Sequence, residues 1–390
     1  MGFVSDHHPQ TQDLNQTPHP PPSLQHFTVA DSQVKMKFFT GIALLASIVS
    51  ANPIELFGRD EPLQAKLIRG AGNTLVKIAL TNAGKSAIKV FVPGTILDKA
   101  AVEKVAVYSN ETRLSFDGVR LRIAPQDLMT EDAFQTIKRG QTIEIKFDFG
   151  EMHDLGDGGI YDLSVKSGIP FAKAGTTEII GAIPINSNTL RIKDVDAKKA
   201  ALTRMAFHQS IKRTLVQSDC KGVENNTVNT ALITCARLSR AAANGTQDDA
   251  RMREYFKTAS PVAKKIVADV FNRVAIECNS RTRGVSMQYC GDVYKSCSPG
   301  VLAYTVPSLN YMVNCPLYFT ALPPLSKTCH GQDQATTTLH EMTHLLQMKG
   351  TLDYGVYGYD ALKTLPGQEN MNHADTYCLF ANAINLGKGC

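Results

Sequence analysis

The pentapeptide His340-Glu341-Met342-Thr343-His344 has residue types and a spacing that suit metal-dependent hydrolysis. Residues four apart lie on one face of an α-helix, so both imidazoles can reach a single metal ion. Glu341 would then lie beside the metal, where its carboxylate can take a proton from a bound water. The flanking residues predict a helix over 334–349 that ends at Gly350. The pattern predicts a catalytic zinc site.

A catalytic zinc site needs a third protein ligand and an open position for water. Gln347 and Gly350 stand where the longer pattern HExxHxxGxxH requires Gly and His, so that pattern is excluded. Two carboxylates stay open as the third ligand. Glu369 lies on a segment that resembles a loop or a helix start. Asp353 follows a chain reversal at Gly350, which would return it towards the histidines.

The composition excludes some partners and indicates a compartment. A formal net charge of +5 over 390 residues is too small to indicate nucleic acid or a basic membrane-binding surface. The most apolar run, Phe38 to Ala51, is too short to span a bilayer. It follows a lysine-flanked Met36 and predicts a secretory signal peptide over 36–51. Residues 1–35 are rich in Pro, His, Gln and Ser, so we expect a disordered leader that precedes the true start and is not translated.

The chain divides into two halves of different character. Residues 52 to 190 predict short strands separated by turns, which are typical of a β-sandwich. The strand candidates are 75–80, 88–92, 142–147, 161–165 and 190–192. This half shows no cluster of metal ligands or nucleophiles, and His153, beside two aspartates, is interpreted as part of a solvated loop.

The second half begins where the cysteines begin. All nine cysteines lie at or after Cys220, which behind a signal peptide predicts an extracellular domain held by disulfides. The dibasic pair Lys212-Arg213 lies just before this border and is a candidate processing site. Cleavage there would leave residues 214–390. This domain is predicted to be mainly helical, with helices near 227–243, 261–277 and 372–384 around the metal-binding helix.

Further motifs resemble the deuterolysins, which are secreted fungal zinc metalloendopeptidases of the aspzincin group. Besides the pentapeptide they are Asp219–Gly222, Cys315–Tyr318, Gly350–Asp353, Tyr357–Asp360, Asn372–Tyr377 and Ala381–Leu386. The resemblance covers the whole of 214–390, and the order of signal, propeptide and dibasic pair matches the precursors of the family. It implies an α+β fold. A β-sandwich-like propeptide with a helical linker over 52–213 would precede a zincin-like domain.

The same resemblance assigns roles to residues. His340, His344 and Asp353 would bind one Zn²⁺ per chain, and Glu341 would be the general base. Asp375 is the rival third ligand, or else it orients a ligand histidine from behind. Tyr357 and Tyr318 are candidates for stabilising the oxyanion, the alternative for Tyr318 being packing beside a disulfide. Three residues separate Asp353 from Tyr357, where the family usually has two.

The resemblance also implies the disulfides Cys220–Cys290, Cys297–Cys315 and Cys329–Cys390. Cys235, Cys278 and Cys378 are left over, so at least one thiol should be free or bonded to another chain unless the pairing is redrawn. The expected partners are protein or peptide substrates, basic proteins among them, and a dibasic processing protease. We expect a secreted monomer.

Two alternatives stay open. One is a secreted binding protein with a structural or inactive metal site, although such a site normally has four protein ligands and no need of Glu341. The other is a metal-dependent hydrolase acting on bonds other than peptides.

Overall fold

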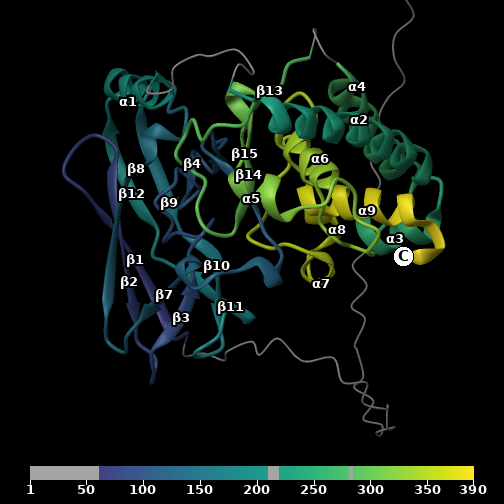
Figure 1. Ribbon diagram of the computed structural model, residues 1–390. Helices are drawn as coiled ribbons and strands as arrows, with labels where there is room; N and C mark the ends of the chain where they lie inside the picture. Colours follow the sequence, from purple (N-terminus) through teal and green to yellow (C-terminus); the bar gives the residue numbers. More distant parts are fainter. Residues whose placement is uncertain (1–60, 210–218, 281–283) are drawn as a thin grey trace, which may run out of the picture. The chain divides into compact units, whose positions relative to one another are not determined.

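The computed structural model describes residues 61–209, 219–280 and 284–390. The predicted leader, the signal peptide and the pair Lys212-Arg213 lie outside these ranges. Strands come first along the described chain and most helices follow, as the colours of Figure 1 show, so the predicted α+β class is confirmed. In these ranges no helix combines the length and the apolar character that a membrane span requires.

Within residues 61–209, which the structure describes, strands of the N-terminal half form three antiparallel sheets of their own, and all the predicted strands are present. Their orders are β1-β2-β8, β11-β10-β3-β7 and β12-β9-β4-β5. In β2 every second residue is buried, because alternate side chains of a strand point to opposite faces. The bounds are β1 (Leu63–Arg69), β2 (Leu75–Asn82), β3 (Ile88–Phe91), β4 (Ala106–Ser109), β5 (Thr112–Arg113), β7 (Phe134–Ile137), β8 (Thr142–Asp148), β9 (Gly159–Ser164), β10 (Lys166–Ala172), β11 (Ile179–Asn186) and β12 (Leu190–Val195). The inward-facing residues share one apolar core.

His153 lies in that core, so its interpretation as a solvated loop residue is wrong. Its side chain is buried, with Nδ1 3.0 Å from the carbonyl oxygen of Phe149 and the ring against Phe116. The 3₁₀ turn Phe149–Glu151 folds the residue inward. Burial lowers the pKa of His153.

Helices dominate the C-terminal half. Helix α4 (Pro261–Asn279) begins at Ser260, whose hydroxyl accepts a hydrogen bond from the Ala263 amide, with Pro261 in the first turn. The other helices are α1 (Ala197–Gln209), at the end of the first half, then α2 (Gly222–Gly245), α3 (Asp249–Phe256), α5 (Pro316–Ala321), α6 (Gln334–His344), α7 (Tyr359–Leu362), α8 (Gly367–Asn370) and α9 (Ala374–Leu386).

Helix α6 carries the pentapeptide through the interior of this half. A capping box starts the helix. The Asp333 carboxylate accepts a hydrogen bond from the Thr336 amide, and the Thr336 hydroxyl accepts one from the Asp333 amide. Every residue of α6 is buried, and the helix packs against α2, α9 and strand β14 (Val301–Val306). The helix ends at His344, earlier than the predicted end at 349.

A fourth sheet contains strands from both halves. Its order is β13-β15-β14-β6, where β13 (Met287–Tyr289) and β15 (Tyr311–Asn314) belong to the C-terminal half and β6 (Arg120–Ile123) to the N-terminal half. Strand β6 pairs antiparallel with β14, placing Arg122 opposite Ala303 and Leu121 opposite Tyr304. No sequence pattern predicts this pairing.

Disulfides tie the C-terminal half together. Among the described cysteines four bonds form: Cys220–Cys290, Cys235–Cys278, Cys297–Cys315 and Cys329–Cys390. The bond between Cys235 and Cys278 joins α2 to α4. Cys378, on α9, remains a buried free thiol. Each bond restricts the unfolded chain and so favours the folded state.

Candidate active site

Helix α6 places two imidazoles side by side in the protein interior. His340 and His344 lie one helical turn apart, are fully buried, and have their Nε2 atoms 3.1 Å apart. The loop after the helix brings in a carboxylate. Asp353 Oδ1 lies 3.2 Å from His340 Nε2 and 3.4 Å from His344 Nε2. The three side chains form one buried cluster of potential metal ligands.

The loop from Leu345 to Asp353 explains how the aspartate returns to the helix. Leu345 leaves the helical conformation, and its carbonyl accepts from the amides of Met348, Lys349 and Gly350. Gly350 then takes a positive φ of 69°, which glycine adopts without steric cost. The Thr351 amide donates to the Thr343 carbonyl, and the two threonine hydroxyls lie 2.8 Å apart. These bonds fix Asp353 against the helix face that carries the histidines.

The donor set fits a zinc ion. Ligand atoms bound tetrahedrally to one zinc at about 2.0–2.2 Å lie about 3.3 Å from one another. The three separations of 3.1, 3.2 and 3.4 Å match this spacing. Asp353 Oδ1 is buried without a hydrogen-bond partner, and a bound cation would satisfy it. Two imidazoles and one carboxylate leave a fourth position open, as in catalytic zinc sites.

The far side of each imidazole is held by an oxygen atom. His344 Nδ1 lies 2.9 Å from the Thr351 carbonyl oxygen, and His340 Nδ1 lies 3.0 Å from Asp375 Oδ1. The other carboxylate oxygen of Asp375 accepts from the Gly358 amide at 2.6 Å. Such partners hold the proton on Nδ1 and leave Nε2 free to bind a metal. Asp375 therefore has the position of an orienting carboxylate, and Asp353 that of the third ligand.

Burial and neighbouring charges shift the pKa values of all three residues of the cluster. Burial and the nearby Arg122 lower the pKa of His340 well below its usual value. Burial alone would raise the pKa of Asp353, but the charge of the neighbouring His344 holds it well below its usual value. Burial opposes the charged form of His344 too, yet Asp353 beside it raises the pKa of His344. The site thus holds Asp353 ionised, as a ligand must be.

Glu341 is also buried, and one of its carboxylate oxygens has no hydrogen-bond partner. Its Oε2 accepts from the hydroxyl of Thr305, on β14, at 2.6 Å, whereas Oε1 has no hydrogen-bond partner. Burial raises the pKa of Glu341 to about 7. A carboxylate with a pKa near neutrality and a free oxygen suits proton transfer to and from a reacting group.

Tyr357 is placed by a tight turn that absorbs the additional residue of its loop. Tyr354 and Gly355 both have positive φ, 53° and 69°, and the Val356 amide donates to the Asp353 carbonyl. This pattern is that of a type I′ turn. The Tyr357 hydroxyl donates to the Leu121 carbonyl oxygen at 3.0 Å. Burial and the nearby Asp353 raise the pKa of Tyr357 well above its usual value, so it stays a hydrogen-bond donor.

Residues 36–388 match the model of the Deuterolysin metalloprotease (M35) family. The chain belongs to this deuterolysin family. It is 48% identical to a neutral protease 2 homologue of Colletotrichum graminicola, over 90% of this chain and all of that protein. A homologue of Phaeosphaeria nodorum is 46% identical over 90% of this chain and 99% of that one. The predicted activity, that of a zinc metalloendopeptidase, is confirmed.

The zinc peptidase from Grifola frondosa is 20% identical and has a TM-score of 0.35, covering 42% of this chain and 97% of that chain.

Two residues considered for the site of this deuterolysin lie elsewhere. The Tyr318 hydroxyl is fully buried against the start of α6, 3.2 Å from both the Gln334 carbonyl oxygen and the Thr338 hydroxyl. Glu369 lies on the short helix α8 and is not part of the ligand cluster among the described residues. The structure thus brings together His340, His344 and Asp353 but neither of these two.

Sequence reasoning missed two residues that contact the site. Thr305 donates a hydrogen bond to Glu341 and lies on strand β14. The other residues of this strand are all apolar or aromatic, so the pattern indicates only a buried strand. Arg122 comes from β6, and its Nη1 lies 3.0 Å from His340 Nδ1. The hydrophobic pattern of a four-residue strand gives no signal for a contact across 218 positions.

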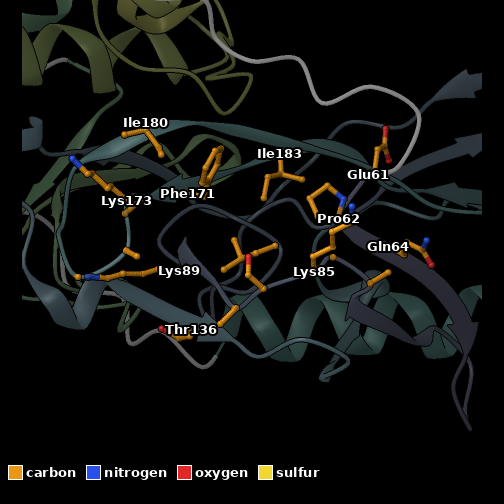
Figure 2. Close-up of a pocket in the computed structure, with 18 residues that line it drawn as sticks. Glu61, Pro62, Gln64, Lys85, Lys89, Thr136, Phe171, Lys173, Ile180 and Ile183 are labelled. Atoms are coloured by element: carbon orange, nitrogen blue, oxygen red, sulfur yellow. The ribbon is translucent and has the colours of Figure 1, made fainter.

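A separate cavity lies in the β-rich half, as Figure 2 shows. Its volume is about 1080 Å³, and Lys85, Lys89 and Lys173 extend along it beside Phe171 and Ile183. None of the ligand-cluster residues lines it. It therefore lies apart from the ligand cluster.

Proposed function

We propose that this deuterolysin is secreted as a precursor and acts outside the cell as an endopeptidase with one zinc ion per chain. Residues 36–51 would be the signal peptide, 52–213 a propeptide with β-sandwich-like sheets, and 214–390 the zincin-like protease. Cleavage after Lys212-Arg213 by a dibasic-specific protease would release the active enzyme. The disulfides of the C-terminal half support secretion, because such bonds persist in oxidising compartments.

One observation carries the proposal. Three ligand atoms with tetrahedral spacing lie next to a buried glutamate that keeps one oxygen free. A structural zinc would instead require a fourth protein ligand at the open coordination position. The alternative of a binding protein with an inactive metal site is therefore disfavoured.

His340, His344 and Asp353 would hold the metal. When bound, zinc polarises the scissile carbonyl and lowers the pKa of a water molecule towards about 7. Glu341 Oε1 takes the proton of the attacking water as the new C–O bond forms. It then delivers that proton to the amine nitrogen as the C–N bond breaks. Asp375 and the Thr351 carbonyl keep the histidines in the metal-binding tautomer.

Tyr357 would supply a further hydrogen bond beside the ligand cluster. Its hydroxyl already donates to a backbone carbonyl, that of Leu121, so it can reach a peptide oxygen there. Donation to the developing oxyanion is typically worth about 3 kcal/mol. The substrates would be proteins and peptides, basic proteins among them, and the enzyme would act as a monomer.

The test uses the processed enzyme and a broad peptide library. Hydrolysis should stop with a chelator, return with zinc, and yield internal cleavages. Glu341→Gln should keep the zinc and lose activity by about 10²- to 10⁴-fold. Substantial hydrolysis by folded, zinc-loaded Glu341→Gln would refute the assigned role, and a folded wild-type enzyme without hydrolysis would refute the proposed function.

A further inference from the structure

Strand β6 of the N-terminal half completes a sheet that borders the active site. It lies antiparallel to β14, the strand whose Thr305 binds Glu341. Without β6, the outer edge of β14 would present unpaired backbone groups, and such an edge binds an extended peptide readily. The segment Arg120–Ile123 therefore occupies a position in which an extended polypeptide substrate can bind.

The backbone of this segment is hydrogen-bonded to the Tyr357 hydroxyl, the group proposed to act on the substrate. The Leu121 carbonyl accepts the hydrogen bond of the Tyr357 hydroxyl. That hydroxyl is the one aimed at the oxyanion in the proposed mechanism. The Leu121–Arg122 peptide group thus takes the hydrogen bond that a scissile peptide group would receive.

The side chain of Arg122 extends this contact behind the ligand histidine. It is fully buried and forms an ion pair with Asp375 Oδ1. Its Nη1 lies 3.0 Å from His340 Nδ1, and Nη2 contacts the thiol of Cys378 at 3.6 Å. A buried guanidinium needs such a partner, because an unpaired charge is costly in the interior. Asp375 Oδ1 is also the acceptor for His340, so the arginine shares the carboxylate that orients the ligand.

We propose that Arg120–Ile123 is a built-in pseudo-substrate, and that Arg122 is the latch that holds it against β14 by pairing with Asp375. This inference rests on the proposed precursor and names the regulation of its active site. The segment occupies the substrate position, accepts the hydrogen bond of Tyr357 and forms an ion pair with Asp375. The uncut chain is therefore latent. Cleavage after Lys212-Arg213 lets the β-rich half leave with its latch.

The experiment uses the full precursor with its processing site removed by Lys212→Ala and Arg213→Ala. Arg122→Ala is introduced into this chain, with Arg122→Lys as the conservative variant. The matched control is Arg191→Ala, which removes an exposed arginine–aspartate pair with Asp162 in the same half. Peptide hydrolysis is measured first. Binding of a fluorescent peptide to zinc-loaded chains that also carry Glu341→Gln provides a readout independent of activity.

Arg122→Ala should raise hydrolysis by the uncut precursor about 30-fold or more, because one partner of a buried charge pair is removed. It should also allow the fluorescent peptide to bind, whereas Arg122→Lys and Arg191→Ala stay close to the latent parent. A folded Arg122→Ala precursor that is as latent as its parent, and excludes the peptide as well, overturns the proposal.

A second measurement covers the case in which Arg122→Ala does not fold. A synthetic peptide of residues 116–126 and its Arg122→Ala counterpart compete with a reporter substrate for processed wild-type enzyme. The parent peptide should compete about 30-fold better. Equal competition overturns the proposal. Processed wild-type enzyme without any hydrolysis would instead refute the proposed function, so the two failures are distinguishable.

Discussion

Two buried carboxylates contact the imidazole of His340 on opposite sides. Asp353 faces Nε2 at 3.2 Å, and Asp375 faces Nδ1 at 3.0 Å. His344 Nε2 lies on the Nε2 side of His340, as Asp353 does, whereas Asp375 lies on the opposite side. Of the two aspartates, only Asp353 can therefore bind one ion together with both histidines. This difference of side is the reason for which we propose Asp353, and not Asp375, as the third ligand.

Isosteric amides test the assignment. In the processed enzyme Asp353→Asn should lose stoichiometric zinc, because a charged ligand is replaced by a weak neutral one. Asp375→Asn should keep zinc with affinity reduced about 10- to 100-fold, as is typical for partners behind a ligand. Zinc per chain, measured after dialysis against graded chelator concentrations, distinguishes them. The reverse order of losses would make Asp375 the ligand.

Much of this residue-scale chemistry could be predicted from the sequence. His340, Glu341 and His344 are separated by a spacing that places them on one helix face, and Gly350 indicated the return of Asp353. Thr305 and Arg122 could not be found, because strand pairing between distant segments brings them to the site. The buried position of Tyr318 depends likewise on packing against α6.

At the scale of elements, the loop after α6 decides the geometry of the site. The sequence favoured helix up to 349, since its residues have good helix propensity. In the structure the Thr343 carbonyl accepts from the Thr351 amide, a bond that a continued helix would exclude. Tertiary hydrogen bonds thus outweigh local propensity, and the shortened helix is what allows Asp353 to return.

His373 fastens this loop to helix α9. It forms a bridge with Leu352, and its Nε2 lies 3.0 Å from the Val356 carbonyl oxygen. Burial lowers the pKa of His373 from 6.5 to about 4. As pH falls below 6.5, the unfolded chain therefore binds a proton that the folded chain does not. Stability is lost between pH 6.5 and 4, by about 3 kcal/mol in total.

The variant His373→Gln isolates this effect. Urea unfolding of zinc-free protein at pH 7 and pH 4 should show a fall in the free energy of unfolding that is about 3 kcal/mol larger in the wild type. The other titrating groups are common to both proteins and cancel in the comparison. Equal falls in the two proteins would mean that His373 is not held neutral by the fold.

At the scale of the whole molecule, the two halves share a core. Val119, Leu121 and Ile123 of the first half pack in one apolar cluster with Tyr304 and Val306 of the second. Composition and cysteine usage predicted the border between the halves, because each has its own character. They could not predict the shared core, since β6 is an ordinary apolar–basic strand whose partner lies in another half.

This shared sheet gives a prediction about backbone exposure. In the precursor, β14 is flanked by β6 on one side and β15 on the other. When processing releases the first half, alternate N–H groups of β14 lose their partners. Amide hydrogen exchange in Val301–Val306 should then be at least about tenfold faster in the processed enzyme than in the precursor with its processing site removed.

Strand β15 provides the internal control. It lies between β13 and β14 in both forms, so exchange in Tyr311–Asn314 should change little. Mass spectrometry of peptides from the two strands measures both in one experiment. Equal protection of β14 in the latent precursor and in the fully active enzyme would show that β6 does not vacate this edge. Substrate would then reach the active site by another route, because a strand that keeps its partner cannot accept an extended substrate at that edge.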